Sequence, residues 1–309
     1  MIVAQHQEHV PVMLDRVMEL LVTGRDGLYI DGTVGAGGHA AAILEAAGSG
    51  ARLLGMDADP AALTKARRNL AAYEPRVTLV HSNYRHMHEA AVRVGFSAVD
   101  GILLDLGLSS MQLDSSDRGF AFRLGGPLDM RFDPRTRGTA AHLLNSAEAP
   151  EIARILRRYG EEPFARRIAH FIVGSRPVTT AEQLAEIVTQ AVPQRQAANS
   201  LARTFQALRI AVNDELGALE EGLSHAVDLL GPQGRLAVIS FHSLEDRIVK
   251  AFFRRLSQTC TCPPDLPVCV CGTIPRLKPV TRRPVFPSEE EVQMNPRSRS
   301  ARLRVAEKI

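Results

Sequence analysis

The stretch "YIDGTVGAGGHAAAIL", residues 29–44, decides the fold of this chain. An apolar run ends in Asp31, glycines follow, and an alanine-rich segment then begins with helical spacing. A strand, a glycine turn and a helix in this order open the ligand site of many parallel α/β domains. Gly35 permits a tight turn, and at Gly37 and Gly38 the missing Cβ lets the backbone approach a ligand closely. A glycine turn alone also fits simple packing, so the surrounding sequence has to decide.

Three further strands are predicted after this turn, in "ARLLGMD" (51–57), "RVTLVH" (76–81) and "VDGILLD" (99–105). A helix entered at Pro60 separates the first two, and Asp59 before it is a good N-cap. The last of these strands is largely apolar, so we expect it to be buried on both faces. The alternation of strands and helices predicts an open parallel sheet with helices on both sides.

The alternation stops between about Met111 and Arg203. A long loop rich in glycine and proline is followed by three amphipathic helical segments with no strand between them, "EAPEIARILRRYG", "EPFARRIAHFIVGSR" and "TTAEQLAEIVTQAV". Thr180 and Gln183 form a capping-box pattern at the start of the third segment. Three successive helices predict a helical subdomain inserted into the sheet domain.

The sheet pattern returns after the insertion. We expect one long helix from Phe205 to near Gly231, a strand in "RLAVISFHS", a helix in "EDRIVKAFFRRL" and a last strand in "SARLRVAEK". The predicted fold class is therefore α/β, with a sheet domain of residues 1–110 and 204–309 that carries a helical subdomain of residues 111–203.

The composition suits a soluble protein with a sizeable core, because 45% of the 309 residues are hydrophobic. No run of about 18 apolar residues occurs, and the first residues lack a basic stretch followed by an apolar one. We therefore expect no membrane span, no signal peptide and a cytosolic location. Residues 276–309 carry nine Lys or Arg and four Glu, a net charge of +5. This basic segment suggests a polyanionic partner, with a merely solvated tail as the alternative.

Carboxylates end several of the predicted strands. Asp31 ends the first, Asp57 ends the second at 20 residues beyond Gly37, and Asp105 ends the fourth. The position of Asp57 suits hydrogen bonds to ribose hydroxyls. Carboxylates beside the turn disfavour the pyrophosphate of NAD and favour a cofactor with a cationic amine and a sulfonium, such as S-adenosylmethionine. An NAD-dependent oxidoreductase and a non-enzymatic RNA-binding protein are the alternatives at this point.

Eight segments between His9 and Lys308 carry a more specific signal: "HVPVML", "YIDGTVGAGGH", "DGILLDLGLSS", "DRGFAF", "GPLDMR", "TFQALRIAVNDEL", "ISFHSLEDRIVK" and "NPRSRSARLRVAEK". Together they resemble the bacterial family of small-subunit ribosomal RNA cytosine-N4 methyltransferases. The resemblance implies a Rossmann-like, S-adenosylmethionine-dependent methyltransferase with an inserted helical substrate-recognition subdomain. It also implies methylation of the exocyclic N4 amine of a decoding-centre cytosine in 16S ribosomal RNA, within the small ribosomal subunit, and it implies neither a DNA nor a membrane partner.

The same resemblance implies a set of cofactor-binding residues. They are Gly37, Gly38 and His39 after the first strand, Asp57 at the ribose, Tyr84 near the adenine, and Asp105 and Gln112, which complete the pocket. The family more often has Phe at position 84, and Tyr keeps the aromatic face.

The catalytic group is not identified by the sequence. The N4 lone pair of cytosine is delocalised and the methyl donor is already activated, so catalysis can come from positioning and from acceptors for the amine. Many amino-methyltransferases have a (D/N/S)-P-P-(Y/F) segment after the fourth strand, where this chain has "DLGLSS". The candidate acceptors are Asp105, Ser109 and Ser110, and the candidates for contact with the target base are His242 and Ser243.

Three groups of arginines are candidate contacts for RNA. They are Arg154, Arg157, Arg158, Arg166 and Arg167 on helices of the insertion, Arg131 in "GPLDMRFD", and Arg297, Arg299, Arg302 and Arg304 near the C-terminus. Alternation along a strand predicts that several of the last group share one face.

The four cysteines, Cys260, Cys262, Cys269 and Cys271, all lie in "CTCPPDLPVCVCG". Two C-x-C pairs provide thiolates of the kind that bind zinc, although the commoner spacing is C-x₂-C. Disulfides are not expected in the cytosol. A structural metal site and a loop of reduced cysteines are the two alternatives.

Overall fold

The computed structural model describes residues 11–24, 26–109, 112, 116–121, 125–260, 262 and 271–309. The chain forms two compact units, which we call the sheet unit (Met1–Gly107 with Ala218–Ile309) and the helical unit (Leu108–Gly217). None of the described helices combines the length and the apolar character that a bilayer crossing requires.

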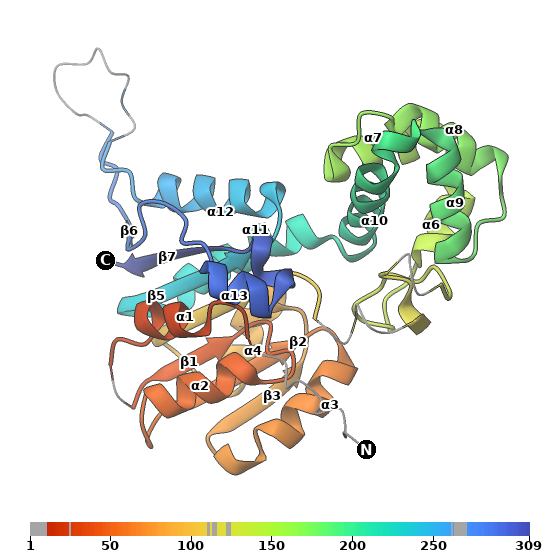
Figure 1. The fold of residues 1–309 in the computed structure, drawn as a ribbon. Coiled ribbons are helices and arrows are strands. Elements are labelled where there is room, and N and C mark those ends of the chain that lie inside the picture. The colour runs from red at the N-terminus through yellow and green to blue at the C-terminus, as the bar shows by residue number, and fades with distance from the viewer. Residues whose placement is uncertain are drawn as a thin grey trace. The chain divides into compact units, whose positions relative to one another are not determined.

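The sheet unit is built on seven described strands in the order β3-β2-β1-β4-β5-β7-β6 (Figure 1). The strands are β1 (Leu28–Asp31), β2 (Arg52–Asp57), β3 (Val77–His81), β4 (Val99–Asp105), β5 (Leu230–Ser240), β6 (Leu277–Pro279) and β7 (Arg302–Lys308). Strands β1 to β5 pair in parallel, and β7 pairs antiparallel with β5 and β6. The predicted parallel sheet and the last strand are confirmed. Because β1 lies between β2 and β4, the strand order reverses there, and open parallel sheets bind their ligands at such a point.

Helices cover both faces of this sheet. The core on one face contains side chains of α1 (Leu14–Leu21), α2 (Gly38–Ala46) and α3 (Pro60–Asn69). The core on the other face contains side chains of α4 (Met87–Arg93), α11 (Glu215–Leu229) and α12 (Ser243–Leu256). Along β4, Ile102 and Leu104 belong to the second core and Leu103 to the first. The strand is thus buried on both faces, as its apolar sequence predicts.

Side-chain caps fix where the helices begin. The Asp59 carboxylate accepts a hydrogen bond from Ala61 N at the start of α3, with Pro60 as the first helical residue. The helix α13 (Glu289–Met294) begins in the same way, because the Ser288 hydroxyl accepts from Glu291 N. The predicted entry into α3 is confirmed.

The helical unit has a hydrophobic core of its own. It contains α6 (Ala140–Ser146), α7 (Ala149–Gly160), α8 (Ala165–Gly174), α9 (Ala181–Ala191) and α10 (Ala197–Asn213). The capping box of Thr180 and Gln183 at the start of α9 is confirmed. Helix α6 was not predicted, although Thr139 caps its first turn by accepting from His142 N.

The long helix predicted from Phe205 to Gly231 is wrong, because the chain breaks it into α10 and α11. Asp214 adopts φ +48° between them, a left-handed conformation that Asp tolerates better than most residues. The Arg209 guanidinium spans the break, since Nε and Nη2 lie 2.8 and 2.9 Å from the carboxylate oxygens of Glu215. The expected boundary at 203/204 therefore falls inside α10, whose whole length belongs to the helical unit.

Candidate functional site

The turn between β1 and α2 depends on glycine at two positions. Gly35 and Gly37 have φ angles of +53° and +90°, which L side chains rarely adopt. A Cβ on Gly37 would lie 2.9 Å from Leu70 Cγ, and one on Gly38 would lie 2.4 Å from Pro11 Cγ. These glycines therefore let α2 pack closely on its neighbours, a reason that the sequence did not disclose.

Asp57, at the end of β2, holds this turn in place. Its Oδ2 accepts a hydrogen bond of 2.9 Å from Gly35 N, and its Oδ1 accepts one of 2.8 Å from Asp59 N. Burial raises the pKa of Asp57 to about 6, with the charge of Asp59 as a lesser cause, although the two backbone donors act in the opposite direction. Each carboxylate oxygen keeps a second lone pair with which to accept from a ligand hydroxyl.

Asp31 and Asp105 end the neighbouring strands β1 and β4. Asp31 Oδ1 accepts from Thr33 N at 3.1 Å, and the Thr33 hydroxyl in turn accepts from Asp105 N at 2.7 Å. Burial, and repulsion by Asp57, raise the pKa of Asp31 to about 7. Burial also raises the pKa of Asp105 well above its ordinary value, and the charges of Asp31 and Glu245 raise it further.

Two oxygens of this acidic cluster point to a ligand. Among the described residues, no hydrogen-bond partner exists for the buried atoms Asp31 Oδ2 and Asp105 Oδ1. Buried carboxylate oxygens are normally satisfied, because leaving them unpaired is costly. A cationic ligand would both satisfy these atoms and favour ionisation of the carboxyls. The cluster thus fits the amine and sulfonium of S-adenosylmethionine.

His39, in the first turn of α2, faces the same cluster. Its Nε2 lies 3.0 Å from the carbonyl oxygen of Val12, which can only accept, so Nε2 carries the proton. The other nitrogen, Nδ1, lies 3.7 Å from Asp105 Oδ2. The buried ring therefore connects the segment before α1 with the end of β4.

Tyr84 is also at this edge of the sheet. It begins the short 3₁₀ helix η2 (Tyr84–His86) just after β3. A Cβ built on Gly32, in the turn after β1, would lie 3.1 Å from Tyr84 Cβ. The aromatic ring packs on α11, where a Cβ on Gly222 would lie 2.6 Å from the ring. Tyr84 is therefore close to the glycine turn, while its ring contacts α11.

Gln112 belongs to the helical unit. Its Oε1 accepts from Ser109 N at 3.0 Å, and its backbone N donates to the Ser109 hydroxyl at 3.2 Å. These reciprocal bonds make Gln112 a buried brace of its own turn. Of the predicted cofactor residues, the sheet unit contains Gly37, Gly38, His39, Asp57, Tyr84 and Asp105. Ser110 lies outside the described residues.

The end of β5 is followed by the two candidate base contacts of the sequence and by one residue, Glu245, that sequence reasoning did not single out. His242 is the N-cap of α12, where its Nδ1 accepts from Glu245 N at 3.3 Å, and Ser243 is the first residue of that helix. Glu245, whose Oε2 accepts from Phe241 N, is buried and contributes to the raised pKa of Asp105. The spacing of Glu245 three residues after His242 was the available signal. Thr33, the other residue missed, needed the fold to reveal it.

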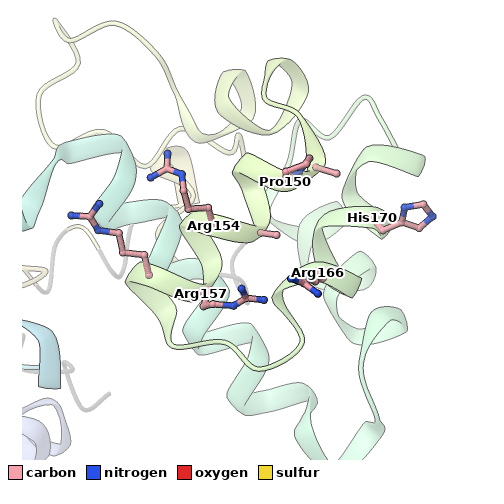
Figure 2. Close-up of a pocket in the computed structure, with 8 residues that line it drawn as sticks. Pro150, Arg154, Arg157, Arg166 and His170 are labelled. Atoms are coloured by element: carbon pink, nitrogen blue, oxygen red, sulfur yellow. The ribbon is translucent and has the colours of Figure 1, made fainter.

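The helical unit carries a basic pocket of about 530 Å³. Its lining comes from α7 and α8 and consists of Ala149, Pro150, Ala153, Arg154, Arg157, Arg158, Arg166 and His170. Figure 2 shows Arg157 and Arg166 extending toward one another from the two helices. Cations directed at one space repel each other unless an anion lies between them. The pocket thus unites four of the five arginines predicted on these helices, while Arg167 places its guanidinium over the Phe171 ring.

Other predicted arginines have structural partners. Arg131 forms a bidentate pair with Asp129 and donates to the carbonyls of Pro134 and Thr136, so it fastens its own loop. Arg304 Nε lies 2.7 Å from Asp246 Oδ1. As alternation along the strand predicts, Arg302 and Arg304 share one face of β7, since both pair with Asp246 on α12. Arg297 and Arg299 lie before that strand, in the 3₁₀ helix η5 (Pro296–Ser300).

Comparisons with known proteins extend over nearly the whole chain. Residues 6–309 match the model of the MraW methylase family. "Ribosomal RNA small subunit methyltransferase H" of Heliobacterium modesticaldum is 54% identical over 308 residues, covering 97% of this chain and 98% of its own length. The protein with the same name from Geobacter sulfurreducens is 52% identical over 307 residues, covering 97% and 99%. Among solved structures, an rRNA methylase from Streptococcus thermophilus aligns with a TM-score of 0.42 at 11% identity, covering 96% of this chain and 93% of its own.

Proposed function

The chain belongs to the MraW methylase family of S-adenosylmethionine-dependent methyltransferases, and from this premise we propose that it methylates the exocyclic N4 amine of a decoding-centre cytosine in 16S ribosomal RNA. The observation that carries the proposal is the full-length likeness, at 54% identity, to a relative named as a small-subunit ribosomal RNA methyltransferase. A ribosomal substrate also implies action in the cytoplasm.

The cofactor is proposed to lie over the ends of β1, β2 and β4. Asp57 would accept from the ribose hydroxyls through the lone pairs that Gly35 N and Asp59 N do not use. The buried oxygens Asp31 Oδ2 and Asp105 Oδ1 would face the cationic groups. Gly37, Gly38 and His39 would form the wall at the start of α2, with Tyr84 toward the adenine.

The acidic cluster argues against NAD as the ligand. Asp31 and Asp105 would repel a pyrophosphate placed at the turn, since two buried carboxyls and two phosphate charges would share one small volume. The same charges stabilise a ligand that carries an ammonium and a sulfonium. The acidic edge of the sheet therefore supports the methyltransferase over the oxidoreductase.

The chemistry asks little of the protein beyond alignment and hydrogen bonding. S-adenosylmethionine supplies a methyl group that its positive sulfur already activates. The protein has to hold the cytosine amine in line with the methyl carbon and to accept a hydrogen bond as the nitrogen gains positive charge. Asp105 Oδ1 is the acceptor that the buried geometry favours, because it has no partner among the described residues, and its two lone pairs can serve the cofactor cation and the amine together. Ser109, the other described candidate of the sequence, belongs to the helical unit and bonds with Gln112 there.

The basic pocket on α7 and α8 is proposed to bind the phosphate backbone of the RNA substrate. Turning a base out of its stack costs a few kcal/mol of free energy, and protein contacts to the flanking phosphates can offset that cost. Arg157 and Arg166 supply planar donors that suit phosphate oxygens. A free nucleoside offers no such phosphates, so the pocket favours structured RNA over cytidine.

A substrate comparison tests the proposal. The protein and cofactor with a labelled methyl group are incubated separately with small subunits, large subunits, transfer RNA and cytidine, and the labelled nucleoside is identified. We expect N4-methylated cytidine from small subunits only. Label on adenine, on carbon-5 of cytosine, or equally on transfer RNA would refute the assignment. Cofactor binding without transfer to any RNA would instead favour a different acceptor.

A further inference from the structure

A cluster of three cysteines lies in the sheet unit, in the segment that connects α12 with β6. The sulfur atoms of Cys260, Cys262 and Cys271 all lie within 4.8 Å of one another. We propose that these three cysteines bind a structural zinc ion. The proposal goes beyond the methyltransferase function, which uses none of these residues. Cys269 lies outside the described residues, so the proposal concerns the other three.

The spacing of the sulfur atoms fits one metal ion better than a disulfide. Cys271 Sγ lies 3.9 Å from Cys260 Sγ. Zinc–thiolate bonds of about 2.3 Å in a tetrahedron put neighbouring sulfurs about 3.8 Å apart, whereas a disulfide needs about 2.0 Å. The two cysteines that are farthest apart in the described sequence thus stand at the distance of two ligands of one zinc ion.

Hydrogen-bond donors also point at these sulfurs. Cys262 N donates to Cys260 Sγ at 3.4 Å, and the Thr273 hydroxyl donates to Cys271 Sγ at 3.1 Å. Gly272 has a φ of +60°, and this left-handed turn brings Thr273 back toward Cys271. Donors to sulfur stabilise a thiolate, which is the form that binds metal, and they orient it. The local backbone is therefore arranged for charged sulfur.

The described residues of this segment have little packing of their own. Arg276 N donates to the carbonyl of Leu256 at 2.8 Å and closes its base. Within residues 257–262 and 271–276, no described residue is buried, and Ile274 is 83% exposed. For these described residues, apolar burial does not offset the conformational entropy that is lost when the chain is ordered. A zinc ion would stabilise the folded segment, because the free energy of metal binding contributes directly to folding in small metal sites.

Binding of zinc converts thiols to thiolates without any redox change. Each cysteine that bonds to the ion releases its proton to the solvent, so uptake becomes weaker as the pH falls. Three thiolates fill three of the four tetrahedral positions of zinc, and cysteine-rich ligand sets are typical of structural rather than catalytic zinc. Zinc is therefore proposed to stabilise the segment without a part in methyl transfer.

The full-length protein, purified reduced and without chelator, provides the first test. We expect about one zinc ion per chain by elemental mass spectrometry. After the metal is removed, Co²⁺ should give visible ligand-field bands and a near-ultraviolet thiolate charge-transfer band, and Zn²⁺ should abolish both. Protein without metal and without a cobalt charge-transfer band would overturn the proposal, and so would a Cys260–Cys271 disulfide detected in freshly purified protein.

Variants locate the ligands. Cys260→Ser, Cys262→Ser and Cys271→Ser should each reduce the cobalt charge-transfer band and lower zinc affinity at least about tenfold, while Thr273→Ala should lower affinity about tenfold and keep the stoichiometry. Ser257→Ala is the matched control, because its hydroxyl donates to Arg254 O in the same segment, away from the sulfurs. Unchanged affinity for S-adenosylmethionine verifies that each variant is folded. An unaltered cobalt spectrum in folded cysteine variants would refute the site.

Discussion

The sheet unit and the helical unit present opposite charges in opposite ways. The sheet unit buries Asp31, Asp57 and Asp105 at neighbouring strand ends, where burial raises the pKa of each carboxyl. The helical unit instead exposes arginines of α7 and α8 around an open pocket. A buried charge is costly unless a ligand satisfies it, so the acidic site suits one small cation. Exposed cations keep their hydration and suit a long polyanion whose binding depends on salt. The difference supports the proposal that the acidic strand ends bind the cofactor and that the arginines of α7 and α8 bind RNA.

The largest effect is expected at Asp57 in the sheet unit. Asp57→Asn removes a charged acceptor from the proposed ribose site, and we expect S-adenosylmethionine to bind about 100-fold more weakly, or about 2.7 kcal/mol. RNA affinity should not change. Calorimetric titration of the folded variant measures both.

Asp59→Asn is the matched control for Asp57→Asn. Its carboxylate caps α3 by accepting from Ala61 N, and Asn caps helices equally well. We expect cofactor affinity within about twofold of the unaltered protein. Equal losses in the two variants would mean that the site depends on the shape of the strand end rather than on the ribose acceptor.

The counterpart in the helical unit is the double variant Arg157→Gln with Arg166→Gln. We expect RNA affinity to fall about tenfold at moderate salt, and the slope of log affinity against log salt to flatten by about 2 units. Cofactor affinity should stay the same, which would separate the two units functionally.

Arg135→Gln with Arg167→Gln removes the same charge from the same unit and serves as control. Arg135 pairs with Asp133, and Arg167 lies over Phe171 outside the pocket lining. If both double variants flatten the salt slope equally, the arginines act only through the net charge of the unit, and the proposal that the pocket binds RNA is contradicted.

The acidic site should also make cofactor binding depend on pH. The pKa values of Asp57 and Asp31 are raised to about 6 and about 7, so both carboxyls lose protons as pH rises from about 5.5 to 7.5. A cationic ligand binds better to the ionised form, and we expect affinity to rise up to about tenfold over this range. Asp31→Asn should remove the upper part of the rise. Affinity that is flat or falls would contradict the proposed contact.

The same carboxyls make the stability of the cofactor-free protein depend on pH. The pKa of Asp31 is about 7 in the folded protein and 3.8 in the unfolded chain. This difference favours the folded state fully below pH 3.8, and the contribution is lost as the pH rises through about 7. The cofactor should therefore increase the melting temperature more at pH about 7.5 than at pH about 5.5. Thermal melts with and without S-adenosylmethionine measure the difference.

Local signals made much of this arrangement predictable. Strand-end carboxylates, the Asp59–Pro60 helix start and the Thr180–Gln183 capping box are short-range patterns, and the structure has all of them. The break at Asp214 was not predictable, because neither glycine nor proline stands at position 214 and its left-handed backbone depends on tertiary context.

The partners of charged residues were not predictable for a related reason. Asp57 bonds to Gly35 N, 22 residues away, and Arg304 pairs with Asp246, 58 residues away. Likewise, the basic pocket exists because α7 packs on α8, which brings Arg157 opposite Arg166. The sequence shows which residues carry charge, and only the fold shows which of them pair with other residues of the protein.

The smallest expected effect concerns the C-terminal arginines, two of which are exposed and one of which is buried in an ion pair. Arg297 and Arg299 are exposed in the 3₁₀ helix η5 (Pro296–Ser300), whereas Arg304 is 8% exposed and paired with Asp246. Arg297→Gln with Arg299→Gln should flatten the RNA salt slope by at most about 2 units and leave the melting temperature unchanged.

Arg304→Gln should instead lower the melting temperature, because it leaves the Asp246 carboxylate without its closest cation. Filter binding at several salt concentrations and thermal melts distinguish the two. If Arg304→Gln altered only the salt slope, the ion pair with Asp246 would not stabilise the fold, and Arg304 would contribute to RNA binding together with Arg297 and Arg299.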